Sequence, residues 1–180
     1  MADTMRSLSE LATLLADNST GNISPQDLRD ALLATVQPGH GEISITSSAE
    51  TSIAAVDTWY PASGTYALSA NAMNWDMNTN GQLRYTGAAD RVVHIAASFS
   101  MTAAGNNKNL SLAVAKNGTV LTPSIVNRQI STGADEGTGA VHAFTSVSTN
   151  DYLTVVVRNN TDSVNATLTT VNLFAMDMAS

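Results

Sequence analysis

The chain has 180 residues, a length typical of one domain with at most a small appendage. It contains no cysteine, which excludes disulfides and thiolate zinc sites. The net charge is −7 and the basic residues are scattered, which argues against a nucleic-acid partner because phosphate binding needs clustered Lys and Arg. No apolar run approaches the ~20 residues that span a membrane, and the first ten residues lack the apolar core of a signal peptide.

Uncharged polar residues take the place of the missing charge. Ser, Thr and Asn make up about a third of the chain, whereas the charged share is 13%, against about 25% in an average protein. Hydrophobic residues still account for 43%, so the sequence is not that of a disordered, charge-rich chain. This composition favours a β-rich domain with an extracellular or virion-type surface.

Residues 1–38 have the spacing of helices and residues 39–180 the spacing of strands, so we expect two parts that meet near Gly39. A polar, glycine-containing stretch at residues 17–22 ends the first predicted helix. The leucines on one face of that helix are Leu8, Leu11, Leu14 and Leu15.

A second short helix is predicted to begin at Ser24, an N-cap residue followed by Pro25 at the first helical position. Ile23 and Leu28 flank this cap in the spacing of a hydrophobic staple. Leu32 follows Leu28 by one turn, so the two leucines share a face.

The leucine stripe is too large to leave in water, and isolated helices of this length are marginal. The segment must therefore dock on its own body, on sister subunits or on a partner. We favour an anchoring role because a Pro- and Gly-containing hinge at residues 37–41 separates it from the rest. The expected anchoring residues are Leu8, Leu11, Leu14, Leu15, Ile23, Leu28 and Leu32.

A calcium loop between the two predicted helices is excluded by its ligands. With Gly21 at the sixth loop position, Asp27 takes the twelfth. The first, third and fifth positions are then Ala16, Asn18 and Thr20. A hard cation needs several carboxylate oxygens, and only Asp27 supplies one.

Residues 39–180 contain short runs with strand spacing, separated by turn residues rather than helices. In the clearest run, residues 91–101, every second side chain is apolar, which predicts one buried face. Asn-Gly pairs at residues 80–81 and 117–118 predict hairpin turns. The pattern is typical of an antiparallel jelly-roll β-sandwich. The predicted runs are 43–45, 53–56, 66–68, 82–86, 91–101, 110–115, 120–121, 141–146, 152–158 and 164–178.

The last run is apolar on both parities. Leu168, Phe174 and Met176 lie on one parity, whereas Val171 and Leu173 lie on the other. A strand that is apolar on both faces is usually buried on both faces, so we expect these residues to line a contact between sister subunits. The alternative is a β-bulge that switches the parity within one sandwich.

No catalytic constellation is evident. His40, His94 and His142 lie far apart in the sequence without metal-binding spacing, so neither a metal nor a cofactor is expected. Asp135 and Glu136 are neighbouring acids in a Gly-rich loop, where a solvated turn is favoured over a glycosidase pair. We therefore expect a protein that is not an enzyme.

Three aromatic residues in predicted loops are open to two interpretations: Trp59, Tyr60 and Trp75. Their rings could stack on the sugars of a host-surface glycan. Alternatively, they are packing plugs for the ends of the sandwich.

Parts of the chain resemble structural proteins of tailed bacteriophages. Residues 7–12, 17–18 and 21–31 resemble the N-terminal segment of many such proteins. A second group of segments is similar to the β domain of the same proteins, which is like the trimeric jelly roll of the C1q/tumour-necrosis-factor type. This second group comprises residues 80–87, 108–119 and 149–158.

The resemblance implies a capsid decoration, cement or head-fibre protein. Such a protein would be a homotrimer that binds the major capsid protein through residues 1–38 and carries its jelly roll, residues 39–180, on the capsid surface. It would stabilise the assembled head of the virion, because binding to the assembled state favours that state. Assembly would take place in the host cytoplasm, with neither nucleic acid nor membrane as a partner.

Two other functions stay open at the level of the sequence. A tail-fibre or receptor-binding module would use the aromatic loop residues to contact a glycan. A hydrolase on a β-sandwich would need a pair of carboxylates that the sequence does not bring together.

Overall fold

The computed structural model describes residues 24, 28, 38–133 and 135–178. The two predicted N-terminal helices lie outside these residues, apart from Ser24 and Leu28. The amide of Leu28 donates to the carbonyl of Ser24 at 3.2 Å, the pairing of one helical turn. Gly39–Met178 form a separate unit from Met1–Pro38, and each is described by itself.

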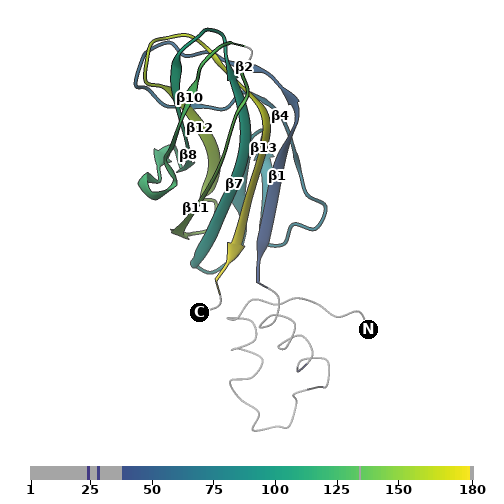
Figure 1. Cartoon of the computed structure of the whole chain (residues 1–180). Helices are drawn as coiled ribbons and strands as arrows, with labels where there is room; N and C mark the ends of the chain where they lie inside the picture. The colour runs from purple at the N-terminus through teal and green to yellow at the C-terminus, as the bar shows by residue number, and fades with distance from the viewer. Residues whose placement is uncertain (1–23, 25–27, 29–37, 134, 179–180) are drawn as a thin grey trace. The chain divides into compact units, whose positions relative to one another are not determined.

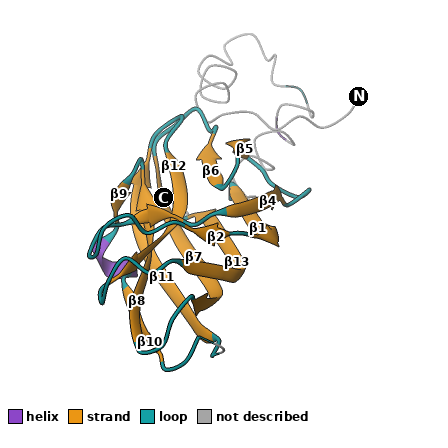
Figure 2. Ribbon diagram, turned by 90° about the horizontal axis from the view of Figure 1, so that it is seen from above, coloured by secondary structure: helices purple, strands orange, loops and turns teal. Residues whose placement is uncertain are grey.

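Gly39–Met178 fold into two antiparallel β-sheets, packed face to face (Figure 1). Sheet A contains β1 (His40–Ser48), β2 (Glu50–Thr51), β4 (Gly64–Leu68), β7 (Arg91–Ala103), β11 (Gly137–Val147) and β13 (Ala166–Asp177). Sheet B contains β3 (Tyr60–Pro61), β5 (Trp75–Thr79), β6 (Gln82–Tyr85), β8 (Lys108–Lys116), β9 (Thr119–Val120), β10 (Val126–Ile130) and β12 (Tyr152–Asn159). A short 3₁₀ helix, η1 (Thr122–Ser124), follows β9 (Figure 2).

The strand order identifies the sandwich as a jelly roll. Sheet A runs β11-β7-β13-β1-β4 and sheet B runs β10-β8-β12-β6-β5. From β6 onward the chain crosses repeatedly between the sheets, so that the last strand, β13, lies between β1 and β7. The prediction of an antiparallel jelly-roll sandwich is confirmed.

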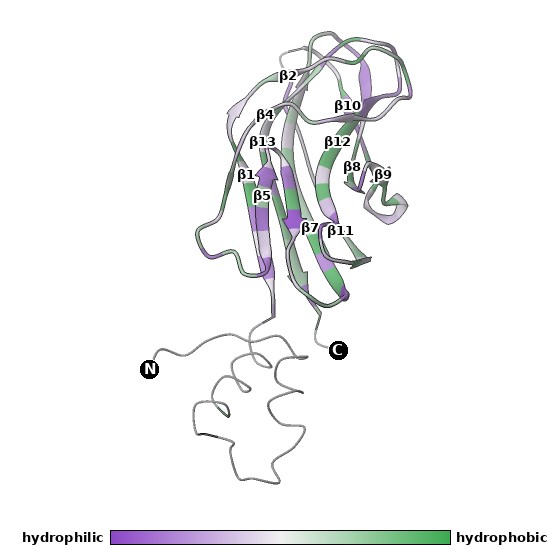
Figure 3. Ribbon diagram, turned by 180° about the vertical axis from the view of Figure 1, so that it is seen from behind, coloured by the Kyte–Doolittle hydropathy of each residue, from purple (hydrophilic) through white to green (hydrophobic). Residues whose placement is uncertain are grey.

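Period-2 patterning accounts for the long strands. The inward side chains of β7, from Val93 to Met101, are all buried, as predicted for residues 91–101. Leu110, Leu112 and Val114 of β8 meet them from the opposite sheet as part of the same core. Figure 3 shows the resulting bands of apolar and polar residues along β7 and β12. These two rows supply much of the apolar area that is removed from water when the sandwich forms.

The predicted strand at residues 53–56 is wrong. These residues lie in an irregular segment between β2 and β3, although Ile53 is buried and its amide donates to the Asn165 side chain at 2.9 Å. The apolar signal came from one core residue in a loop. Conversely, β5 and β10 were not predicted, because most of their side chains are partly or fully exposed and show little alternation.

The parity of the last strand is explained by a β-bulge. The register of β13 against β7 shifts between Leu168 and Thr170, so Leu168 and Val171 both point into the core. From Val171 onward the alternation is regular, and Phe174 and Met176 point outward. The alternative that the sequence left open, a bulge within one sandwich, is therefore correct.

The two Asn-Gly pairs form hairpins of different geometry. Asn117 and Gly118 both have positive φ, 50° and 79°, as a type I′ turn requires. In the other pair only Gly81 is left-handed, with φ of 75°. Its neighbour Asn80 instead accepts a hydrogen bond from the amide of Tyr66 at 2.9 Å and thereby fixes β4 beside the turn.

A buried asparagine organises the loop between β12 and β13. The side chain of Asn159 is fully buried, and its Nδ2 donates to Asp162 and to the carbonyl of Val164, both at 2.9 Å. Its Oδ1 accepts from the amides of Thr161 and Asp162 at 2.8 and 3.2 Å. One side chain thus satisfies four polar groups of the loop.

We predict that Asn159→Ala lowers the free energy of unfolding by about 3 kcal/mol, because it removes a buried side chain and its four hydrogen bonds to partly buried groups of the loop. Asn78→Ala, at an exposed position of β5, is the control and should change stability by less than about 0.5 kcal/mol. Urea denaturation followed by circular dichroism measures both. Equal effects for the two variants would contradict the role assigned to Asn159.

The beginning and the end of the jelly-roll chain segment meet at Asp177. Its amide donates to the carbonyl of Gly39 at 2.8 Å, and its carboxylate lies 3.9 Å from the guanidinium of Arg91. A Cβ at Gly39 would lie 2.6 Å from that carboxylate, so a side chain there would disturb the junction. Burial raises the pKa of Asp177, and the positive charge of Arg91 opposes this shift only in part.

The raised pKa of Asp177 means that the folded protein holds this proton more tightly than the unfolded chain does. Stability from this group is therefore fully present below the unfolded pKa of about 3.9 and is lost as pH rises through the folded pKa. We predict that Asp177→Asn raises the melting temperature at pH 7 and that the difference shrinks toward pH 4. Thermal melts from pH 4 to 8 test this, with Asp90→Asn at an exposed site as the control. A pH-independent difference would contradict the prediction.

Candidate functional site

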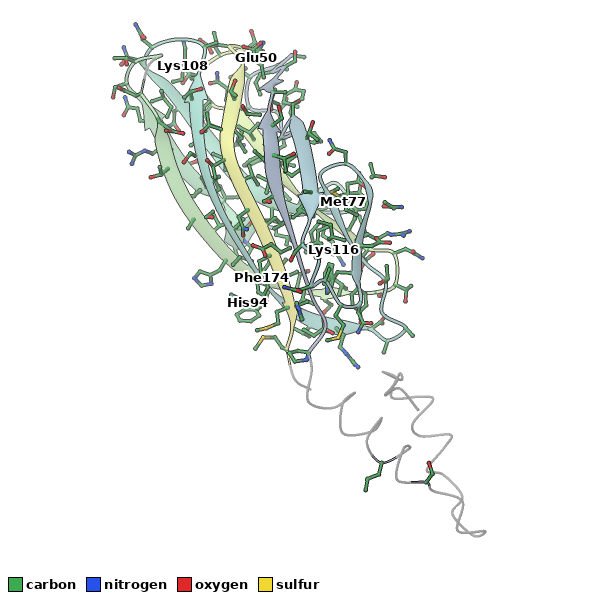
Figure 4. All side chains as sticks on the ribbon, turned by 90° about the vertical axis from the view of Figure 1, so that its right-hand side faces the viewer. Glu50, Met77, His94, Lys108, Lys116 and Phe174 are labelled. Carbon is green, nitrogen blue, oxygen red and sulfur yellow. The ribbon has the colours of Figure 1, made fainter. Side chains whose placement is uncertain are left out.

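The outer face of sheet A carries an apolar patch at the end where β1 begins and β13 ends. Cross-strand pairing places Phe144 of β11 beside His94 of β7, which in turn lies beside Met176 of β13. Met176 is paired with His40 of β1, so one row of side chains crosses four strands. Figure 4 labels His94 and Phe174 at this end, with Lys108 and Glu50 at the other.

Several members of this patch are well exposed in the single chain. Phe144 is 58% exposed, Val92 is 50% exposed and Met178 is 41% exposed, while Phe174 and Met176 are half-buried. Side chains of this size are unusual as neighbours on a surface that faces only water. Together these side chains form the outer patch, which consists of Val92, His94, Phe144, Phe174, Met176 and Met178.

The rings of the outer patch contact one another across β7 and β11. The His94 ring lies 5.1 Å from the Phe144 ring and 5.9 Å from the His142 ring, measured between centroids. His142 is exposed and lies diagonally across the strand pair from His94, because its direct partner is Ala96. The register therefore brings together two histidines that are 48 positions apart in the sequence.

A shallow groove of about 540 Å³ adjoins this histidine pair. Small side chains, among them Ala96, Ser98 and Ala140, leave the hollow between His142 and Asn172. Asn172 donates its Nδ2 to Glu42 of β1, so the carboxylate nearest to the groove already has a partner. The groove is thus apolar at its floor, with imidazole and amide groups at its rim.

On the outer face of sheet B, in contrast, apolar side chains of β8 and β12 are covered by the chain itself. Trp59 and Val120 pack over a cluster of Ala113, Ala115 and Val156. The guanidinium of Arg158 lies 4.7 Å from the centre of the Trp59 ring, a cation–π distance. Trp59 is therefore a packing residue, the second of the two interpretations of the aromatic loop residues.

The other two aromatic residues also have structural contacts. Trp75 is only 4% exposed, and its ring lies edge-on to Tyr85 at 5.1 Å inside the core. The burial of Trp75 favours the packing interpretation for this residue, because its ring faces the interior. The hydroxyl of Tyr60 accepts a hydrogen bond from the amide of Ala55 at 2.9 Å and holds the preceding loop.

The structure separates the residues that the sequence assigned together to a subunit contact. Leu168, Val171 and Leu173 are buried in the core and have no surface to offer a second chain. Their assignment to an interface is wrong, for the reason given by the bulge. Phe174 and Met176 lie on the outer face and remain available, and their neighbours on β7 and β11 were not predicted.

Of the predicted anchoring residues only Leu28 is described, and its side chain is 56% exposed. Leu8, Leu11, Leu14, Leu15, Ile23 and Leu32 lie outside the described residues. The anchoring role of the N-terminal segment stays a prediction.

The paired acids of the Gly-rich loop do not converge. Asp135 accepts a hydrogen bond from the amide of Thr132 at 2.8 Å, whereas Glu136 accepts one from the hydroxyl of Thr169. Asp135 thus closes the loop on itself and Glu136 ties it to β13, the arrangement expected of a structural turn. Within residues 38–133 and 135–178, no three His, Asp or Glu side chains gather around a point where a metal could bind. None of the described helical segments is long and apolar enough to cross a bilayer.

No protein-family model matches the sequence, and no curated protein matches it. Solved structures of the same fold are TNF-type jelly rolls. Murine APRIL at pH 5.0 matches with a TM-score of 0.53 and 10% identity, over 76% of this chain and 98% of that one. The Eiger TNF of S. frugiperda matches with a TM-score of 0.54 and 10% identity, over 80% and 94%. The PRD1 vertex protein P5 has a TM-score of 0.46 and 14% identity, over 78% of this chain and 96% of that one. At these identities the similarity shows the fold alone.

Proposed function

We propose that the chain is a homotrimeric structural protein of a phage virion, a decoration or cement protein that binds the outer surface of the capsid and stabilises the head. In this proposal the jelly roll forms the trimer and the N-terminal segment binds the major capsid protein. The observation that carries the proposal is the outer patch, since the two faces of the sandwich differ so sharply in how they are covered.

The outer patch has the composition of the buried centre of an interface. It combines two phenylalanines with methionine and histidine, and the carboxylate that flanks it, Glu42 beside Phe174, is bonded to Asn172. Interface centres are enriched in aromatic residues and methionine and depleted in charge. The groove beside the patch provides a hollow into which side chains of a second copy can fit. A cyclic trimer closes such a heterologous contact without leaving a free edge.

The assignment to a virion depends on the resemblance of the N-terminal segment and of the β domain to tailed-phage structural proteins. The low charge and the coat of Ser, Thr and Asn suit a particle surface. A tail-fibre module with a glycan site has less support, since Trp75 is buried and Trp59 is packed against Ala113 and Ala115.

We predict that the chain sediments as a trimer, with three times the 18.7 kDa mass of one chain, and that Phe144→Asp or Val92→Asp converts it to a monomer. A carboxylate buried at the contact costs several kcal/mol, enough to weaken association more than 100-fold. Both positions are exposed in the single chain, so the fold should tolerate the substitutions.

Val56→Asp is the matched control for this experiment. Val56 is 46% exposed, close to the 50% of Val92, but it lies in the segment between β2 and β3. The control should remain a trimer. A wild-type monomer at micromolar concentration, or a trimer that survives both patch substitutions, would overturn the proposed interface.

We predict that paired substitutions of predicted anchoring residues, Leu11→Asp with Leu15→Asp, remove the protein from particles and leave the trimer intact. Quantitative mass spectrometry of purified particles gives the copy number relative to the major capsid protein, and sedimentation gives the mass. The paired substitutions Ser7→Asp with Ser9→Asp add the same charge to the segment and should leave the copy number unchanged. Unchanged occupancy in the leucine variant would contradict the anchoring role, and labelling of the tail instead of the head would contradict decoration.

A further inference from the structure

The histidine pair on sheet A has no hydrogen-bonding role in the described fold, although His94 also belongs to the outer patch. His94 and His142 are on neighbouring antiparallel strands and point to the same side of the sheet. Neither imidazole makes a hydrogen bond or ion pair to another described residue, although His94 contacts the Phe144 ring. Four ring nitrogens are thus available on one small area of surface.

The separation of the two rings suits a shared metal ion. Imidazole–metal bonds are about 2.1 Å long, so a bound ion lies about 3 Å from each ring centre and the two centres are at most about 6 Å apart. The observed centroid distance is 5.9 Å, with the ring planes inclined by 57°. Small rotations about the side-chain bonds are therefore enough to direct both rings at one ion.

The donor set selects the class of ion. Imidazole suits zinc, copper and nickel, whereas magnesium and calcium require carboxylate or carbonyl oxygens. The nearest carboxylate on this face, Glu42, is in the same cross-strand row as His142 but on β1, with β7 and β13 between them. It is also bonded to Asn172. Among the described residues that line the groove, the oxygen donors of the side chains are the Ser98 hydroxyl and the Asn172 amide, and none is a carboxylate.

We propose that His94 and His142 together bind one first-row transition-metal ion, with water in its remaining coordination positions. Both histidines belong to one chain, and His94 is shared between this site and the outer patch. The other titratable groups on this face near the pair are His40 and Glu42 of β1, and Arg91 at the start of β7 is paired with Asp177.

The first test is isothermal titration of the full, untagged chain with Cu²⁺, Ni²⁺ and Zn²⁺ at pH 7.5. One ion per chain is expected, with copper bound more tightly than nickel or zinc, as the general order of divalent affinities requires. The electron paramagnetic resonance spectrum of the copper form should show coupling to two imidazole nitrogens. Absence of binding at millimolar metal, or a spectrum without nitrogen coupling, would overturn the proposal.

Variants locate the site. His94→Ala and His142→Ala should each weaken binding at least tenfold, while His40→Ala, on the same face but across Met176 from His94, should bind as the wild type does. Melting curves without metal confirm that the variants fold, and added metal should raise the melting temperature only of the wild type and His40→Ala.

Equal binding by the wild type and both pair variants would show that the ion lies elsewhere and would overturn the assignment. Sedimentation of the same samples keeps this outcome separate from the fate of the trimer. A metal-binding monomer would leave the site intact and refute the proposed assembly, and a trimer that binds no metal would do the reverse.

Discussion

The pairing of β13 between β1 and β7 is the constraint on which the rest of the molecule depends. It joins residues from the two ends of the jelly roll, such as His40 and Met176, and sheet A cannot close until the last strand is in place. Contacts between such distant residues cost more loop entropy than local ones do, so they are expected to form late in folding. The same pairing fixes the outer face, because it sets Phe174 and Met176 beside Ala96 and His94. The same strand register therefore determines both the buried core and the candidate interface.

Local patterning was sufficient to predict the sandwich and insufficient to predict which residues are at its surface. The alternation of β7 holds over its whole length, so its buried face could be assigned from the sequence. The alternation of β13 is broken by one extra residue between Leu168 and Thr170, and a bulge has no reliable local signal. Assigning Leu168 to a subunit contact was the direct result. The strand predicted at residues 53–56 is wrong for a related reason, because a single buried residue in a loop, Ile53, resembles the start of a strand.

The proximity of His94 and His142 could not be predicted from the sequence, for a different physical reason. His94 and His142 each occupy outward positions that their own strands predict, and only the register of β7 against β11 makes them neighbours. Register is decided by long-range packing and turn lengths, not by either strand alone. Trp75 illustrates the converse case, in which a residue taken for a loop aromatic lies in β5 and completes the core against Tyr85. Burial of this kind depends on which strands are opposite one another.

The hydrogen bond from Asp177 to Gly39 also bears on how this domain relates to any longer chain. Because the first and last residues of the domain lie close together, a domain of this geometry can be inserted into a surface loop of another protein without distorting that loop. The loops at the far end, around Lys108 and Glu50 in Figure 4, lie away from both junctions, and Lys108 there is paired with Asp162 of the loop that Asn159 holds. The contact between Asp177 and Gly39 thus separates two ends of the domain. One end carries both connections to the rest of the chain, and the opposite end carries only loops.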